Sequence, residues 1–232
     1  MNTKPTIKID IVSDIVCPWC YIGKRRLEKA MHQLADKFQF EVEYHPFELN
    51  PNTPVEGVNQ KEHLIDKFGS EARYEQLTGN VTNVAAQEGL TFDYDKQTTS
   101  PNTRMLHSIV QLAKLEGKHL EVMEALFNAY FTDGVDLTNK NTLREIAKSV
   151  GLVNAADPDI FASPQAIQQI SLAEKELSKL GITGVPFYII NNKYGVSGAQ
   201  ASETFVKAFQ EIHAESEVAI TGDACDVDGK NC

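Results

Sequence analysis

The residues of this sequence best suited to chemistry are two cysteines three positions apart, in the stretch Cys17-Pro18-Trp19-Cys20. The alternating residues 7–12 before them predict a strand, and the apolar residues after them recur at helical spacing. We therefore expect a helix over residues 17–37, with Cys17 at or just before its first turn. Unpaired backbone N–H groups and the positive end of the helix dipole favour a thiolate there, and a thiolate is the nucleophile of disulfide exchange.

Cys20 follows Cys17 on the same face of the expected helix, about one turn along. It could attack a mixed disulfide formed at Cys17, or close on Cys17 to store an oxidising equivalent. Pro18 suits a first helical position because it has no N–H group and its φ is already helical. The pattern indicates a redox site whose Cys17 sulfur is exposed and within reach of Cys20.

Three other interpretations of the cysteine pair remain open. A structural disulfide is the weakest, because a bridge that closes so small a loop removes little entropy from the unfolded chain. Half of a zinc site is the second, but no further C-x-x-C or H-x-x-x-H follows at the usual spacing, so we expect no metal. A pair of buried, inert thiols is the third.

The composition is that of a globular protein, with 232 residues, 42% hydrophobic and 23% charged. The net charge of −10 argues against nucleic acid as a partner. The longest apolar run, residues 185–190, is too short to span a bilayer, so we expect no membrane partner. Residues 1–5 lack the apolar segment of a signal peptide. These features predict a cytoplasmic protein, and in that compartment a C-x-x-C is more often catalytic than structural.

The order of the expected elements indicates an α/β fold with an interruption. Residues 6–12 and 40–44 read as strands on either side of the helix, a βαβ unit that the right-handed crossover rule makes a parallel pair. Residues 58–180 have helical periodicity throughout. Strand patterns return at residues 186–190 and 194–196, joined by a tight turn, and a last amphipathic helix follows.

This order divides the chain into three parts. Residues 1–57 and 181–214 are expected to form two halves of one domain, residues 58–180 an inserted all-helical domain, and residues 215–232 a flexible polar tail that contains two cysteines.

The order and the motifs together resemble the thioredoxin superfamily, and within it the DsbA-like branch, where a helical domain interrupts the βαβ and ββα halves. The chain is most similar there to the FrnE-type oxidoreductases. The residues that carry the resemblance are Asp14-x-x-Cys17-Pro18-Trp19-Cys20-Tyr21-Ile22-Gly23, Pro101-Asn102-Thr103, Gly181-Ile182-Thr183-Gly184-Val185-Pro186-Phe187 and Val196-Ser197-Gly198-Ala199-Gln200.

The resemblance implies a cis Val185–Pro186 bond beside the C-x-x-C, whereas the sequence alone equally allows a trans bond. In the cis form, the backbone of Val185 could pair with an extended substrate, and Pro186 would lie against the sulfurs. Trp19 could offer a substrate an apolar contact or could pack in the core. Pro18, Trp19, Val185 and Pro186 are therefore the expected substrate-binding residues.

Other polar residues have two readings each. The carboxylate of Asp14 could face the Cys17 sulfur and disfavour its thiolate, or it could cap the helix. Asn102 or Thr103 could cap a helix, and His107 more often fills a helix face than serves a site, so these three are not expected to be catalytic.

The tail cysteines, Cys225 and Cys232, are expected to form a second redox pair that exchanges with Cys17 and Cys20. FrnE-type proteins have a C-terminal cysteine pair that this tail resembles, although the spacing here is wider. The alternative is that both are incidental surface thiols.

The sequence thus predicts a thiol–disulfide oxidoreductase of protein disulfides, with disulfide isomerisation as a further activity. Its partners would be protein or peptide thiols and disulfides, with glutathione or a thioredoxin-type reductant as electron donor, and no cofactor is needed. The alternative enzyme class is a glutathione-dependent kappa-type transferase or a 2-hydroxychromene-2-carboxylate isomerase, relatives that generally lack the second cysteine. A module that binds zinc through all four cysteines is the third reading.

Overall fold

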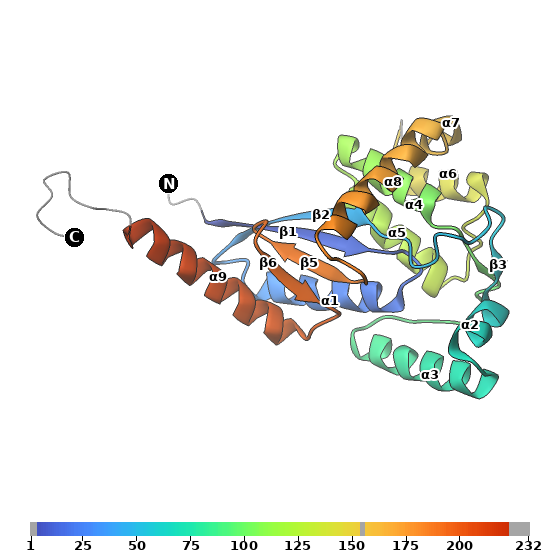
Figure 1. The fold of residues 1–232 in the computed structure, drawn as a ribbon, viewed down its shortest axis with the longest axis horizontal. Helices are drawn as coiled ribbons and strands as arrows, with labels where there is room; N and C mark the ends of the chain where they lie inside the picture. Colours follow the sequence, from blue (N-terminus) through green and yellow to red (C-terminus); the bar gives the residue numbers. More distant parts are fainter. Residues whose placement is uncertain (1–3, 154–155, 223–232) are drawn as a thin grey trace, which may run out of the picture.

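The computed structural model describes residues 4–153 and 156–222, with side chains described as far as residue 215. Its centre is a four-stranded sheet in the order β2-β1-β5-β6 (Figure 1). The strands are β1 (Thr6–Ser13), β2 (Gln39–Pro46), β5 (Phe187–Ile190) and β6 (Tyr194–Ser197). Strand β1 is parallel to β2 and antiparallel to β5, and β6 is antiparallel to β5. The predicted βαβ and ββα halves are therefore present in one sheet.

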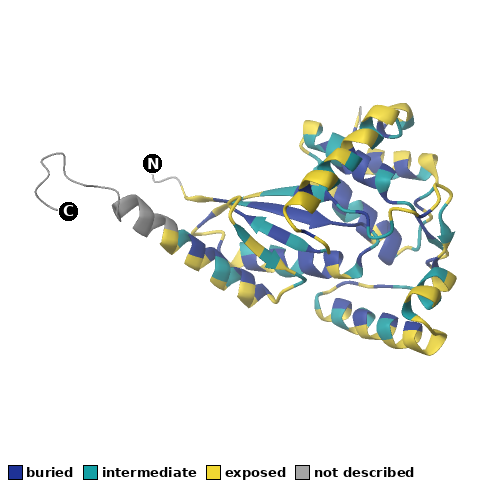
Figure 2. Cartoon of the chain, in the orientation of Figure 1, coloured by how far each residue is buried: buried dark blue, intermediate teal, exposed yellow. Residues whose placement is uncertain are grey.

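Strand β1 lies inside the sheet, between β2 and β5, and its residues from Ile9 to Ser13 are all buried. Ile9 is paired with Val42 on one side and with Ile190 on the other, and it is fully buried. Helices α1 (Pro18–Gln33) and α9 (Ser202–Gly222) pack side by side against one face of the sheet (Figure 1). Figure 2 shows β1 as largely buried.

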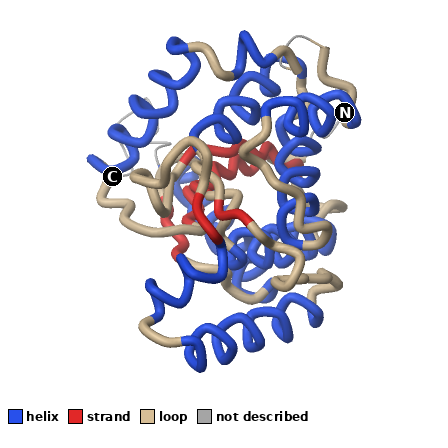
Figure 3. Tube along the Cα trace, turned by 90° about the vertical axis from the view of Figure 1, so that its right-hand side faces the viewer, coloured by secondary structure: helices blue, strands red, loops and turns tan. Residues whose placement is uncertain are grey.

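Between β2 and β5 the chain is mostly helical, and Figure 3 shows helices surrounding the central strands. The helices of this insertion are α2 (Gln60–Phe68), α3 (Glu71–Gln87), α4 (Arg104–Ala113), a 3₁₀ turn (Lys114–Glu116), α5 (His119–Phe131), α6 (Lys140–Ser149), α7 (Pro158–Phe161) and α8 (Pro164–Lys179). Two short strands, β3 (Val58–Asn59) and β4 (Thr99–Ser100), pair within it, although an all-helical insertion was expected. Strands of two residues are too short to show an alternating pattern.

The hydrophobic core runs through the sheet and the insertion without a break, from Ile9 in β1 to Tyr21 in α1 and Phe127 in α5. Tyr21 and Phe127 stack with their ring centroids 4.8 Å apart. The division of the chain at residues 58 and 180 stays a prediction. None of the helices described has the length and apolarity needed to cross a membrane.

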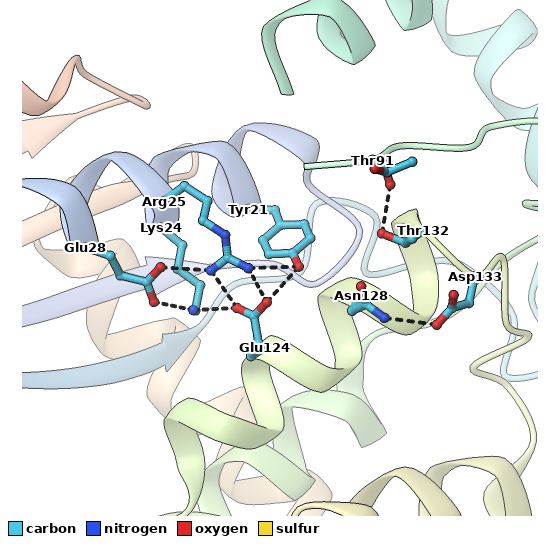
Figure 4. A network of polar contacts seen from close by, with 9 residues as sticks. All are labelled: Tyr21, Lys24, Arg25, Glu28, Thr91, Glu124, Asn128, Thr132 and Asp133. Atoms are coloured by element: carbon cyan, nitrogen blue, oxygen red, sulfur yellow. Dashed lines mark hydrogen bonds and ion pairs between the residues drawn. The ribbon is translucent and has the colours of Figure 1, made fainter. Parts of the chain in front are cut away.

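Helix α1 is tied to α5 by a group of charged and polar side chains around Glu124 (Figure 4). The Tyr21 hydroxyl donates to Glu124 Oε1 at 2.8 Å, Lys24 Nζ donates to Oε2 at 2.5 Å, and Arg25 Nη1 donates to Oε2 at 2.9 Å. Burial by itself would raise the pKa of Glu124, but the hydrogen bonds from Arg25 and Lys24 outweigh it and hold the pKa at about 2. The charged form of Glu124 is therefore part of what holds α1 in place.

We predict that Glu124→Gln lowers the free energy of unfolding by about 2 kcal/mol at neutral pH, the scale of hydrogen bonds to a charged group. Because the folded-state pKa of about 2 lies below the ordinary value of 4.5, this contribution is complete above pH 4.5 and is lost as pH falls towards 2. Urea unfolding at a series of pH values measures it. The control is Glu121→Gln on the exposed side of α5. A wild-type advantage over Glu124→Gln that does not shrink at acid pH would contradict the prediction.

Candidate active site

Cys17 is the N-cap residue of α1, with an extended backbone (φ −91°, ψ 110°), and Pro18 occupies the first turn. The Cys17 N–H donates to the Asp14 carbonyl at 3.1 Å, and the Cys20 N–H donates to the Cys17 carbonyl at 3.0 Å. The expected position of Cys17 just before the first turn is therefore confirmed. The helix ends at Gln33 rather than at residue 37, with Leu34 as its C-cap.

The expectation of an exposed Cys17 sulfur is wrong, because the residue is only 4% exposed. Cys17 instead lies in the wall of a pocket of about 480 Å³, beside Val16, Trp19 and Val185. Both cysteines are free thiols in the structure. Cys17 is therefore accessible through the pocket and not across an open surface.

Cys20 lies deeper than Cys17 and is not among the residues that line the pocket. It is 3% exposed, and burial raises its pKa well above the ordinary value, as does its contact with Cys17. The Ser13 side chain and the Asp14 backbone act in the opposite direction but do not outweigh the burial. At neutral pH the Cys20 thiol is therefore protonated.

The Val185–Pro186 bond is cis, and it lies beside the cysteines as expected. The Cys17 thiol donates to the Val185 carbonyl with the sulfur and oxygen 3.8 Å apart. On α1, a Cβ at Gly23 would lie 2.2 Å from Oη of Tyr188 in β5, whereas its distance to Pro186 Cγ, 3.4 Å, would be an ordinary contact. The absence of a side chain at residue 23 thus leaves room for the Tyr188 hydroxyl between α1 and β5.

A family model described as a DSBA-like thioredoxin domain matches residues 8–210. The chain belongs to this family. Among solved structures, a probable DsbA oxidoreductase from Streptomyces coelicolor is 31% identical, with a TM-score of 0.80 over 95% of this chain and 92% of its own.

Two further solved structures share the fold at lower identity. A cytosolic disulfide reductase, DsbM from Pseudomonas aeruginosa, solved with GSH, is 15% identical with a TM-score of 0.62, over 90% of this chain and 99% of its own. A 2-hydroxychromene-2-carboxylate isomerase is 13% identical with a TM-score of 0.68, over 90% of this chain and 98% of its own. At these identities, the two structures show only that the fold is shared.

The pocket of this DsbA-like chain brings together Cys17, Pro18, Trp19 and Val185. Trp19 is 43% exposed, so it offers its ring to the pocket and to solvent and does not pack in the core. Pro186 is not part of the pocket wall, because its ring lies against α1 near Gly23. Of the expected substrate-binding residues, three therefore share the pocket and Pro186 supports it from behind.

Asp14 is fully buried, and its side chain does not cap α1. Its Oδ2 accepts from the Leu49 N–H at 2.8 Å, and its Oδ1 lies 3.3 Å from His107 Nε2. His107 is 1% exposed, so the histidine that was expected to fill a helix face in fact contacts the residue three positions before Cys17. Asp14 and His107 are so far apart in the sequence that no local pattern predicts this contact.

The helical insertion supplies most of the remaining pocket wall, through residues that the sequence did not single out. They include Gln60, His63 and Lys67 from α2, Val81 from α3, and Gln97. No carboxylate is found among the described residues that line the pocket. The wall thus combines apolar surface with a few neutral polar groups and one lysine.

One group of described side chains could offer a metal three ligand atoms: Asp10, Glu43 and His45, on β1 and β2 and outside the pocket wall. Lys8 Nζ lies 3.5 Å from Asp10 Oδ1, and Lys114 Nζ lies 2.6 Å from Glu43 Oε1. Two lysines thus already neutralise these carboxylates. Cys225 and Cys232 lie outside the described residues. The structure therefore does not test a zinc site made of all four cysteines.

We predict that iodoacetamide modifies Cys17 of the reduced protein well before Cys20. Cys17 reaches the pocket, whereas Cys20 lies outside it with a raised pKa. Peptide mapping of the alkylated protein over time measures the two rates. In Cys17→Ser, Cys20 should react slowly until denaturant exposes it, and rapid modification of Cys20 in the folded variant would contradict the prediction.

Proposed function

We propose that the chain is a thiol–disulfide oxidoreductase of protein disulfides, with Cys17 as the nucleophile and Cys20 as the resolving thiol. The observation that carries the proposal is the arrangement of the two sulfurs, one in the pocket wall beside the Val185 carbonyl and the other behind it. Only one of them can meet a substrate first.

In the reducing direction, the Cys17 thiolate attacks one sulfur of a substrate disulfide. A Cys17–substrate disulfide forms, and the other substrate sulfur leaves as a thiolate that takes up a proton. Cys20 then loses its proton and attacks the Cys17 sulfur, which releases the second substrate thiol. The substrate gains two electrons and two protons, and Cys17 and Cys20 are left as a disulfide. The reverse sequence oxidises a substrate dithiol.

The raised pKa of Cys20 supports this division of roles. A protonated Cys20 does not compete with Cys17 for the incoming disulfide, because only the thiolate attacks. After the mixed disulfide has formed, Cys20 is the thiol that follows Cys17 by one helical turn and so can reach its sulfur.

Substrate binding would use the same wall of the pocket. The Val185 backbone could pair with an extended peptide, and Pro18 and Trp19 could contact its apolar side chains. Isomerisation of disulfides needs the same groups, because it begins with the same mixed disulfide at Cys17. The FrnE-type subclass, a cytoplasmic location, and glutathione or a thioredoxin-type reductant as electron donor stay predictions.

The second candidate is a glutathione-dependent transferase or isomerase of small molecules. One observation favours it: the pocket of about 480 Å³ lies in the size range of small-ligand sites, roughly 300–1,000 Å³. Such an enzyme has no need of Cys20. Small-molecule isomerase activity, together with insulin reduction that survives Cys20→Ser unchanged, would favour this candidate.

We predict that Cys17→Ser reduces insulin reduction to the background rate, whereas Cys20→Ser accumulates a protein–insulin mixed disulfide. The first variant lacks the nucleophile, and the second can form the intermediate but cannot resolve it. Non-reducing electrophoresis and mass spectrometry detect the trapped species at residue 17. Trapping through Cys20 in the Cys17→Ser variant would reverse the assigned roles.

We also predict that Cys225 and Cys232 exchange disulfides with Cys17 and Cys20. The basis is the presence of two further cysteines after α9. Graded oxidation followed by mass spectrometry should detect a Cys225–Cys232 disulfide or a disulfide from either residue to the C-x-x-C. If neither disulfide forms in the 232-residue chain, the hypothesis of a second redox pair is wrong.

A further inference from the structure

Two buried glutamines, Gln60 and Gln97, lie in the wall of the pocket that contains Cys17. They are 1% and 4% exposed. Gln60 Nε2 donates to Gln97 Oε1 at 3.2 Å, which leaves Gln60 Oε1 and Gln97 Nε2 without a hydrogen-bond partner. Turning both amides over exchanges the roles and again leaves one acceptor and one donor free. Buried polar groups are nearly always paired, so this arrangement needs an explanation.

The backbone places the two glutamines next to each other. Strands β3 and β4 pair with Asn59 opposite Thr99, and the Gln60 N–H donates to the Thr98 carbonyl at 3.1 Å. Gln60 therefore leaves one strand of the pair where Gln97 approaches the other. The short strands β3 and β4 thus fix two amide side chains at one place in an otherwise mostly apolar wall.

The two free atoms of the glutamine pair match an uncharged ligand group, because one is an acceptor and the other a donor. His63 lies one turn after Gln60, and burial, with Lys67 nearby, lowers its pKa, so its ring is neutral at neutral pH. Lys67 lies two turns after Gln60 and donates to Asn50 Oδ1 at 3.2 Å. An amide offers one N–H and one C=O group, which matches the free acceptor and the free donor of the pair.

We propose that Gln60 and Gln97 form a subsite that hydrogen-bonds an uncharged amide of the thiol or disulfide substrate. This inference rests on the proposed function, since it concerns the group that accompanies the sulfur attacked by Cys17. The apolar part of the substrate fills the pocket between the subsite and Cys17. The two free atoms are buried, so a ligand amide pairs with them only after the glutamine side chains turn about their last bond, which is soft in glutamine, and exchange the Gln60–Gln97 hydrogen bond for bonds to the ligand.

The amide could belong to a small thiol or to a glutamine side chain of a peptide. Mixed disulfides with thionitrobenzoate test both, because attack on the substrate sulfur releases the coloured thionitrobenzoate thiolate. The small-thiol arm compares N-acetylcysteamine with 2-mercaptoethyl acetate, which has an ester oxygen in place of the amide N–H. The peptide arm compares otherwise identical peptides with Gln, Met or Glu next to cysteine.

We expect the wild-type protein to prefer the amide probe over its ester or Met counterpart by about 10-fold or more in kcat/KM, because the other probes leave a buried polar group unpaired. The double variant Gln60→Met, Gln97→Met should bring this ratio close to one. Gln76→Met, on the exposed side of α3, is the control and should keep the wild-type ratio. The arm that shows the preference identifies whether a small thiol or a peptide supplies the amide.

Equal rates for the amide probe and its ester or Met counterpart in both arms, a preference for the Glu peptide, or an amide preference that survives in the double variant would overturn the subsite. The wild-type comparison needs no variant, so it decides the question even if the double variant does not fold. A failure of the proposed function looks different, because then no probe of either kind would react through Cys17.

Discussion

The position of Cys17 depends on how the start of α1 is held. On one side, the absence of a side chain at Gly23 leaves room for the hydroxyl of Tyr188 in β5, the strand that follows the cis Val185–Pro186 bond. On the other side, Lys24 and Arg25 bind Glu124 of the inserted helix α5. The N-terminus of α1 therefore lies between the two parts of the fold. A thiol at that N-terminus faces a pocket whose walls come from both.

The two sulfurs differ in access because of this arrangement, although the residues are only one helical turn apart. Cys17 lines the pocket, and Cys20 is enclosed behind it with a raised pKa. Disulfide exchange needs such an asymmetry, since one thiol must meet the substrate and the other must wait for the mixed disulfide. The DsbA-like insertion contributes by enclosing the pocket, through α2 and the pair of glutamines positioned by β3 and β4.

The sequence predicts those parts of the fold whose residues are close together along the chain. The strand–Cys17–helix order, the hairpin after Pro186 and the helical insertion all follow from periodicity within short stretches. The pocket could not be predicted in the same way, because its wall combines residues such as Trp19, Gln97 and Val185 that are far apart in the chain. The burial of Cys17 and the Asp14–His107 contact depend on the same long-range packing.

We propose that substrate enters the pocket between the cis Val185–Pro186 loop and the insertion to reach Cys17. A crystal structure of the Cys20→Ser variant, trapped as a mixed disulfide with a peptide, tests it most directly. We expect a bond from Cys17 to the peptide, a peptide backbone beside Val185, and one peptide side chain inside the pocket. A peptide bound through Cys17 but lying wholly outside the pocket, with the pocket walls unchanged, would contradict it.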